Sequence, residues 1–210
     1  MTGAGPAAAV EPPATDMQAV PTDGAFLHFG PGALMFSAGA TVKLAGTVIP
    51  GGTVKIDPNG TLITELGYRW GKFGLSITGG FPPLATVSGA GSLSSLKTLG
   101  RIRYGPTVVT AHYHFTQFAR FQPYLGGGPV FLLVFANKDG AIQHLDVHGH
   151  VGAAVQAGAE YALSDRWFLF GDAKKAWLRT TAAAELQSAP VQARIRLDPV
   201  VVASGLSCRF

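Results

Sequence analysis

From about Ala25 to its end, the chain alternates between large apolar residues and small or polar residues. The closing segment, VVVASGLSCRF, places Val202, Leu206 and Phe210 on one face and Ser207 and Arg209 on the other. A period of two is typical of a β-strand whose two faces meet different surroundings. The pattern therefore predicts an all-β protein.

The same alternation recurs in segments that are separated by turn-forming residues. Several of these segments reach the 9–11 residues that a tilted strand needs to cross a bilayer. Eight strands are predicted, at about residues 25–36, 60–70, 73–82, 106–116, 122–135, 149–163, 167–178 and 198–210.

The connections between the predicted strands alternate in length. Three are short turns, WGK, TQFARF and SDR, and the other four are long loops at about residues 37–59, 83–105, 136–148 and 179–197. Tight turns at one end and long loops at the other are typical of an antiparallel up-and-down barrel. In an outer membrane the short turns face the periplasm and the long loops face outward, so both chain ends lie on the periplasmic side.

Composition places this barrel in a membrane. Hydrophobic residues make up 47% of the chain and charged residues 13%, and the mean hydropathy is +0.26. The longest apolar run, Val130 to Ala136, is too short for a membrane-spanning helix, and closed barrels are the other structure that satisfies the backbone in lipid. Trp70 and Trp167 at short turns, and Trp177 at the far end of its strand, fit aromatic belts at two interfaces.

Net charge and cysteine content limit the possible partners. The net charge of +4 is scattered, without a basic stripe interleaved with aromatics, so nucleic acid is not an expected partner. Acidic lipid head groups fit the same charge, and membrane lipids and lipopolysaccharide are the predicted surroundings. Cys208 is the single cysteine and can form neither an internal disulfide nor a cysteine metal site.

Residues 1–24 form a separate Pro/Ala-rich segment that is expected to be disordered, followed by the barrel at 25–210. The first residues contain neither a basic region nor an apolar core of signal-peptide length. An export signal is therefore expected to be absent from this chain.

Segments spread over about Thr61 to Phe210 resemble the OmpW family of small outer-membrane barrels. The resemblance implies an eight-stranded transmembrane barrel in a Gram-negative outer membrane, with a narrow apolar lumen for passive passage of small hydrophobic molecules. It also implies that Phe210 belongs to the signal read by the barrel-assembly machinery. The segments that carry it are GLSITGGFPP, YGPTVVTAHYHF, FQPYLGGGPVF, VQAGAEYALSDRWFLFGDAKKAWLRT and RIRLDPVVVASGLSCRF.

The first predicted strand departs from this pattern, because it contains Pro31. Proline cannot donate to a strand ladder and is expected only at an edge or a bulge.

The inward faces of the strands decide what the lumen can do, since an eight-stranded barrel is filled by side chains or holds one small ligand. An upper apolar lining is predicted from Val130, Leu132, Phe168 and Phe170. Buried charges must be paired, so the inward polar residues are predicted to form a plug below it. That plug consists of Glu65, Arg69, His112, His114, Gln156, Glu160, Asp172 and Lys174.

A plug beneath an apolar chamber predicts that solutes leave sideways, between strands weakened by Gly and Pro at GGGP, GFPP and YGP. The alternatives are a filled docking barrel with functional outer loops, and a soluble lipocalin-type barrel, whose outer faces are expected to be polar. His112 and His114, with Glu65 or Glu160, offer a base and its orienter, but the chain lacks a GxSxG motif.

No enzyme activity, cofactor or metal is therefore predicted. His144, His148 and His150 lie near one long loop, where solvated side chains are expected rather than a metal site. The oligomeric state stays open.

Overall fold

The computed structural model of the protein describes residues 23–210. Residues 1–22 of the predicted disordered segment lie outside the described residues, and the first strand begins at Gly24. Within the described part of the chain, no helix is long and apolar enough to cross a membrane.

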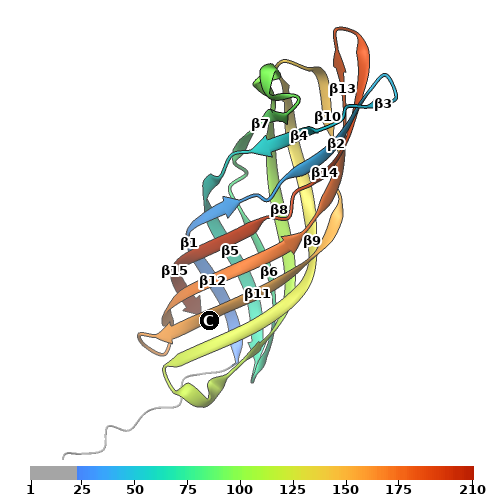
Figure 1. Ribbon diagram of the computed structural model, residues 1–210. Helices are drawn as coiled ribbons and strands as arrows, with labels where there is room; N and C mark the ends of the chain where they lie inside the picture. The colour runs from blue at the N-terminus through green and yellow to red at the C-terminus, as the bar shows by residue number, and fades with distance from the viewer. Residues whose placement is uncertain (1–22) are drawn as a thin grey trace, which may run out of the picture.

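Eight antiparallel strands close into a barrel (Figure 1). Each strand pairs with its neighbours in the order β8-β6-β5-β1-β15-β12-β11-β9, and the pairing of β8 with β9 closes the ring. The barrel strands are β1 (Gly24–Met35), β5 (Asn59–Trp70), β6 (Phe73–Gly80), β8 (Thr98–His114), β9 (Phe121–Asp139), β11 (Val151–Ala162), β12 (Trp167–Trp177) and β15 (Val200–Arg209).

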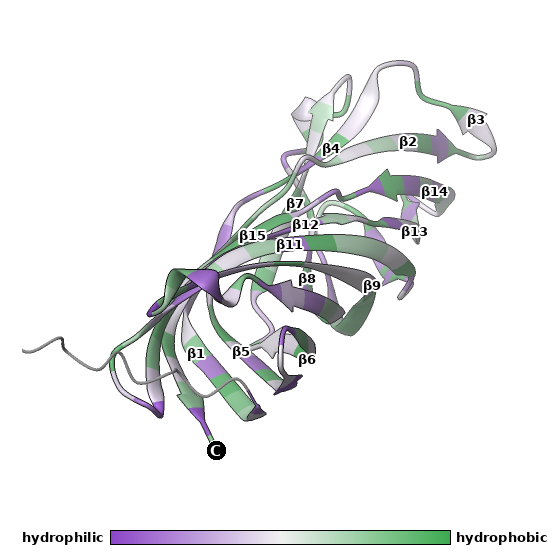
Figure 2. Cartoon of the chain, turned by 90° about the horizontal axis from the view of Figure 1, so that it is seen from below, coloured by the Kyte–Doolittle hydropathy of each residue, from purple (hydrophilic) through white to green (hydrophobic). Residues whose placement is uncertain are grey.

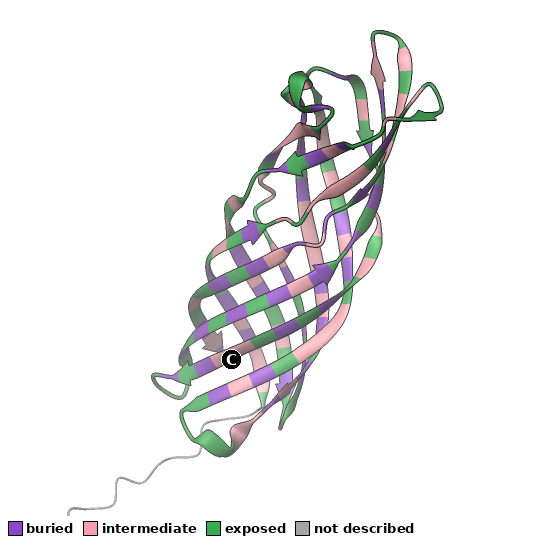
Figure 3. Cartoon of the chain, in the orientation of Figure 1, coloured by how far each residue is buried: buried purple, intermediate pink, exposed green. Residues whose placement is uncertain are grey.

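The predicted alternation of faces is confirmed along these strands. In β5, Leu62, Leu66 and Trp70 are exposed, whereas Glu65 and Arg69 are buried. Buried and exposed residues alternate in the same way around the wall (Figure 3), and the view from below shows hydrophobic and hydrophilic bands along barrel strands such as β1 and β5 (Figure 2). The outer face of the barrel is apolar, which excludes the polar outer faces expected of a lipocalin-type barrel.

The four long connections differ from the prediction, because they are largely β-structure and not loops. They form an extension at the end of the barrel opposite the short turns (Figure 1). Their inward faces carry Val42, Ile56, Ala184 and Ile195, and this apolar surface requires burial, which paired strands provide. The extension contains β2 (Gly39–Leu44), β3 (Thr47–Val48), β4 (Gly52–Ile56), β7 (Leu84–Gly91), η1 (Ser94–Leu96), β10 (Gln143–Val147), β13 (Arg179–Leu186) and β14 (Ala189–Arg196).

Strands β8 and β9 also run beyond their predicted bounds and continue from the barrel into this extension. The short turns agree with the prediction, and one of them contains η2 (Thr116–Phe118). The extension and the barrel therefore share two continuous strands.

Pro31 lies in a strand with neighbours on both sides, and not at an edge. The wall accommodates it by a gap: the β1–β15 ladder stops at Phe29 and resumes at Gly32, while pairing with β5 continues through Pro31. The two backbones approach closely at this gap. A Cβ added to Gly205 would lie 2.2 Å from the Phe29 carbonyl oxygen.

Gly205→Ala is expected to destabilise the barrel by about 1–3 kcal/mol, because the added methyl group meets backbone that cannot yield without separating β1 from β15. Gly171→Ala is the matched control, since a Cβ on Gly171 of the neighbouring strand meets nothing within 4 Å. Urea unfolding of the refolded barrel in detergent measures both. Equal stability of the two variants would contradict the close approach.

Candidate functional site: an apolar chamber above a charged layer

Glu160, on β11, is the centre of a buried ionic group near the periplasmic end of the barrel. Its carboxylate lies 2.6 Å from Arg209 Nη2 and 3.0 Å from His28 Nε2, and it accepts a hydrogen bond from Ser207 Oγ at 3.2 Å. Arg69 Nη1 lies 3.7 Å away and donates to Gln122 Oε1 at 2.6 Å. These side chains join opposite sides of the barrel across its lumen.

A second ionic group surrounds Lys174, on β12. Lys174 Nζ lies 2.8 Å from Glu65 Oε2 and 2.7 Å from Asp172 Oδ2. Gln156 and Tyr124 both donate to Asp172, at 2.8 and 3.2 Å. His28 connects the two groups, because its Nδ1 lies 3.8 Å from Glu65.

Together these groups form a charged layer, defined as the two ionic clusters around Glu160 and Lys174. Three buried carboxylates, Glu65, Glu160 and Asp172, face three buried basic side chains, which are Arg69, Lys174 and Arg209. Such charges tolerate burial only while each keeps its partner. The layer therefore crosses the lumen as a network of paired, buried charges.

All eight polar residues predicted for the lumen are buried inside the barrel. The strand pattern placed them inward, but His28, Gln122 and Arg209 were not among the predicted residues. The alternation of inward and outward positions could have identified them. In β1, for example, His28 lies on the same inward face as Phe26, whereas Phe29 faces outward.

Phe168 and Phe170 correct one detail of the prediction. Both are buried, but they lie at the level of the charged layer and not in an upper lining. Phe170 stacks on His28 with ring centroids 4.4 Å apart, and Arg209 lies 4.0 Å from the centroid of Phe168. Strand β12 begins at the short-turn end, so its first inward residues are low in the barrel. Leu132, further along β9, lines the apolar chamber, and Val130 packs in the same buried cluster as Leu132 and Phe170.

The histidine pair has no catalytic arrangement among the described residues. His112 Nδ1 and His114 Nε2 lie 2.8 Å apart, and His114 Nδ1 reaches Glu160 only at 4.0 Å. The hydrogen bonds that form here join neither ring to a serine. The pair packs against Tyr124 as part of the lumen filling.

Metal binding is also disfavoured by the observed contacts. Among the described residues, His28, Glu65 and Asp172 are the one group that is compact enough to ligate an ion. The ammonium group of Lys174 lies between the two carboxylates and takes the position of a cation. In the extension, His144 contacts Glu185 and His148 contacts Asp146, so these histidines do not converge.

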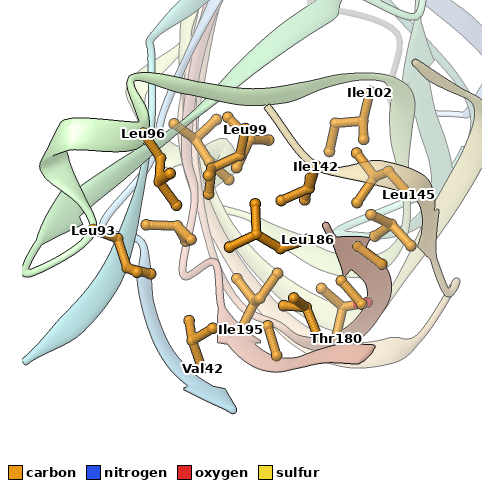
Figure 4. A pocket seen from close by; sticks show the side chains of 18 of the residues that line it. Val42, Leu93, Leu96, Leu99, Ile102, Ile142, Leu145, Thr180, Leu186 and Ile195 are labelled. Carbon is orange, nitrogen blue, oxygen red and sulfur yellow. The ribbon is translucent and has the colours of Figure 1, made fainter. Parts of the chain in front are cut away.

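Above the charged layer, the extension encloses an apolar chamber of about 70 Å³. Its lining comes from the inward faces of the extension and the upper barrel, and every lining residue except Thr180 is apolar. The labelled side chains, Val42, Leu99, Ile102 and Ile195 among them, point toward this common space (Figure 4). The Thr180 hydroxyl is already engaged, because it donates to the His148 carbonyl oxygen at 2.5 Å. The chamber therefore provides apolar contact without hydrogen-bonding groups.

One part of the chamber wall is a turn held by Asp139. Its carboxylate accepts the N–H groups of Leu145 and His144, at 2.9 and 3.0 Å. These bonds hold the pKa of the exposed Asp139 carboxyl below its ordinary value, because both N–H groups stabilise the ionised form. Ile142 and Leu145 on this turn both line the chamber.

A narrow side pocket, defined as the space between the end of β6 and β8, lies lower in the wall. The β6–β8 ladder ends at Thr78 opposite Val108, and β7 takes over at Leu84 opposite Arg103. Residues 79–83, with sequence GGFPP, therefore lack ladder pairing with β8, although Gly79 and Gly80 still pair with β5. The pocket measures about 20 Å³ and is lined by wall residues such as Gly79 and Pro106 and by lumen residues that include Lys174.

The side pocket and the chamber belong to one continuous apolar interior. Val108 and Leu34 line the pocket, Leu132 and Ile102 line the chamber, and all four belong to the same buried cluster. Of the segments predicted to weaken the wall, GFPP and YGP border the pocket. GGGP keeps its ladder to β11, but the β8–β9 ladder is interrupted beside it, between Val108 and Ala111.

Comparison with known proteins assigns the family. The model of the OmpW family matches residues 81–210. The dibenzothiophene metabolism operon protein PahQ of Pseudomonas aeruginosa is 30% identical over 176 residues, which cover 83% of each chain. The chain belongs to the OmpW family. The protein is located in the outer membrane, as predicted from its sequence.

Other OmpW-family relatives are similar over most of the chain. The outer membrane protein AlkL of Ectopseudomonas oleovorans is 29% identical over 170 residues, covering 80% of this chain and 74% of AlkL. The solid-state NMR structure of AlkL in lipid bilayers has a TM-score of 0.71 at 26% identity, covering 100% of this chain and 97% of AlkL. The crystal structure of OprG from Pseudomonas aeruginosa shares the fold, with a TM-score of 0.84 at 20% identity and coverage of 90% and 97%.

Removing the Glu160 carboxylate is expected to destabilise this OmpW-family barrel by about 3–5 kcal/mol, because Arg209, Arg69 and His28 then lose a shared buried partner. Urea unfolding of Glu160→Ala in detergent measures the loss. Glu185→Ala removes the same group from the exposed end of β13 and is expected to change stability little. Unchanged stability of Glu160→Ala would contradict a paired charged layer.

Proposed function

We propose that this protein admits small apolar molecules from the outside into the outer membrane by passive diffusion. A solute enters the apolar chamber of the extension, passes into the upper lumen and leaves sideways through the side pocket into the bilayer. The arrangement that supports this route most directly is an apolar chamber placed above a fully paired charged layer. The first attracts apolar solutes and the second gives them no onward path down the lumen.

The free energy for this passage comes from the solute itself. Burial of apolar surface away from water contributes about 25 cal/mol per Å², so both the chamber and the lipid interior are favourable to an apolar molecule. A gradient from outside to bilayer then suffices. We propose accordingly that the protein catalyses no reaction and that its charged layer is structural.

The size of the chamber limits what enters without rearrangement. Its volume of about 70 Å³ is smaller than the roughly 150 Å³ of an apolar cavity that holds benzene. Entry of a ring compound therefore requires the chamber lining to move outward. Such movement disrupts few strand hydrogen bonds at the ends of segments. Three lining residues lie at such ends: Leu93 precedes η1, Leu96 ends η1, and Leu186 ends β13.

The names of relatives support an apolar solute class. One relative is a protein of a dibenzothiophene metabolism operon. Dibenzothiophene is a flat aromatic sulfur heterocycle without hydrogen-bond donors, and the chamber offers such a molecule contact without unpaired polar groups. We infer that flat or linear apolar compounds are the preferred solutes.

The side pocket is the proposed exit because the β6–β8 ladder ends there. Pro82, Pro83 and Pro106 provide no N–H groups, so separating these strands breaks fewer backbone hydrogen bonds than separating strands with an unbroken ladder. The pocket is narrow at about 20 Å³ and must widen during passage. Lys174 on its inner side marks the start of the charged layer, below which an apolar solute does not continue.

Filling the chamber is expected to reduce uptake several-fold. Ala184→Phe places a ring among the residues that line the chamber, whereas Ala183→Phe places it on the exposed face of the same strand. Uptake of a fluorescent polycyclic aromatic compound by cells that carry each variant measures the effect, and gel mobility before and after heating checks that the barrel is folded.

Normal uptake through a folded Ala184→Phe barrel would contradict passage through the chamber. That result would favour the alternative in which the barrel is a docking structure and the extension provides the functional surface. Loss of uptake in both variants would also contradict passage through the chamber, because the ring of the control variant Ala183→Phe lies outside the chamber.

Blocking the side pocket from the lipid side is expected to stop uptake as well. In a Cys208→Ser background, Gly79→Cys is labelled with a bulky lipophilic maleimide, and Gly171→Cys is labelled as the control. A Cβ at either position meets nothing within 4 Å, but only Gly79 borders the pocket. If uptake through the labelled Gly79→Cys barrel equals uptake through the labelled Gly171→Cys barrel, solutes leave by another route.

Phe210 ends the chain with its ring exposed on the outer face and its N–H donating to the Ala25 carbonyl oxygen at 2.9 Å. Its part in recognition by the barrel-assembly machinery stays a prediction.

A further inference from the structure

The outer face of the second sheet carries a group of basic side chains that the proposed passage does not use. Strands β13, β14 and β2 are adjacent, and their inward residues line the chamber. Their outward residues include Arg179 on β13, Arg194 and Arg196 on β14, and Lys43 on β2, all of them exposed. We call these four residues the basic patch.

The strand register brings these cations together. Arg179 lies directly opposite Arg196, and Lys43 lies opposite Gln192, one outward position along β14 from Arg194. Like charges directly opposite each other in a sheet are destabilising unless an anion lies between them. Successive outward positions on one strand are about 6.6 Å apart, so the four side chains cover a compact area.

Acidic partners within the protein are few. Arg196 Nε lies 3.3 Å from Asp198 Oδ2, and this is the one ion pair that the basic patch forms within residues 23–210. Asp146 shares this side of the sheet, but it is 3.5 Å from His148. In the described part of the chain, Arg179, Arg194 and Lys43 have no carboxylate within ion-pair distance.

The basic patch is placed at the height of lipid head groups. Trp177 is half-exposed on the outer face of β12, and an outward tryptophan at a strand end marks the membrane interface. Arg179 is the next outward residue after Trp177, about 6.6 Å further along the chain. Below Trp177, outward residues such as Val202 and Leu206 face the acyl chains.

Two shallow grooves cross this face. One is bordered by Arg179, Arg194 and Arg196 together with Thr41 and Thr181, and the other by Lys43, His148 and Arg194. The threonine hydroxyls and guanidinium groups present donors toward the same space, which suits an anion with several oxygen acceptors.

We propose that the basic patch binds the phosphate groups of lipid A, the membrane anchor of lipopolysaccharide in the outer leaflet. Guanidinium groups bind phosphates through paired, charge-assisted hydrogen bonds, and the acyl chains of the same molecule pack on the apolar wall below. Bound lipid A neutralises Arg179, which lies opposite Arg196, and braces the outer side of the chamber wall.

Binding of lipid A to the full-length refolded barrel in a non-ionic detergent tests this proposal. Bisphosphorylated lipid A is titrated against the wild type and against Arg179→Gln/Arg194→Gln, with lipid A stripped of phosphate as the second probe. The wild type is expected to prefer the phosphorylated probe by at least about ten-fold, and the double variant to lose that preference. Both proteins are first shown to be folded by gel mobility before and after heating.

Arg120→Gln/Arg166→Gln is the matched control, because it removes the same charge from exposed turns at the periplasmic end. This variant is expected to keep the wild-type preference. The proposal is overturned if the wild type binds both probes equally, if the control loses the preference as the patch variant does, or if phosphatidylglycerol or inorganic phosphate competes with lipid A at equal concentration.

Discussion

Closure of the strand ladder is the constraint on which the rest of this structure depends. In a bilayer every backbone N–H and C=O group needs a partner, and a closed ring of antiparallel strands provides it without helices. Closure then divides the side chains by parity into a lipid-facing and a lumen-facing set. Interruptions of the ladder, such as those in the β1–β15 pairing at Pro31 and in the β6–β8 pairing after Thr78, become points where the wall can respond to strain. The first is closed tightly by Gly205, and the second borders the side pocket.

The charged layer makes the two ends of the barrel interior chemically different. Three buried carboxylates and three buried basic side chains contact one another across the lumen of the lower barrel. Breaking any pair would leave an uncompensated charge in a place where water cannot screen it. The apolar chamber lies above this layer, and the proposed solute route turns at Lys174, where the two regions meet. In that proposal the polar residues act by blocking passage down the lumen.

The extension joins two different environments through one sheet. Its inward residues complete an apolar chamber, whereas its outward residues carry the basic patch. The alternation of a strand makes this possible, because neighbours such as Arg194 and Ile195 necessarily point to opposite sides. A lipid bound outside would therefore contact the same strands that enclose the chamber. A stiffer outer leaflet would then restrict movement of the chamber wall.

The sequence by itself determined the strand faces, the up-and-down order and the burial of the lumen residues, because a period of two and alternating loop lengths are local properties. It did not determine height within the barrel: Phe168 lies beside Arg209 because strand tilt and register place it there. Nor did it reveal that the long connections are strands, since their small and polar residues resemble loops until a partner strand is present. The assembly of Glu160 with residues from β1, β5 and β15 likewise arises only on closure, which brings together side chains as far apart in sequence as His28 and Glu160.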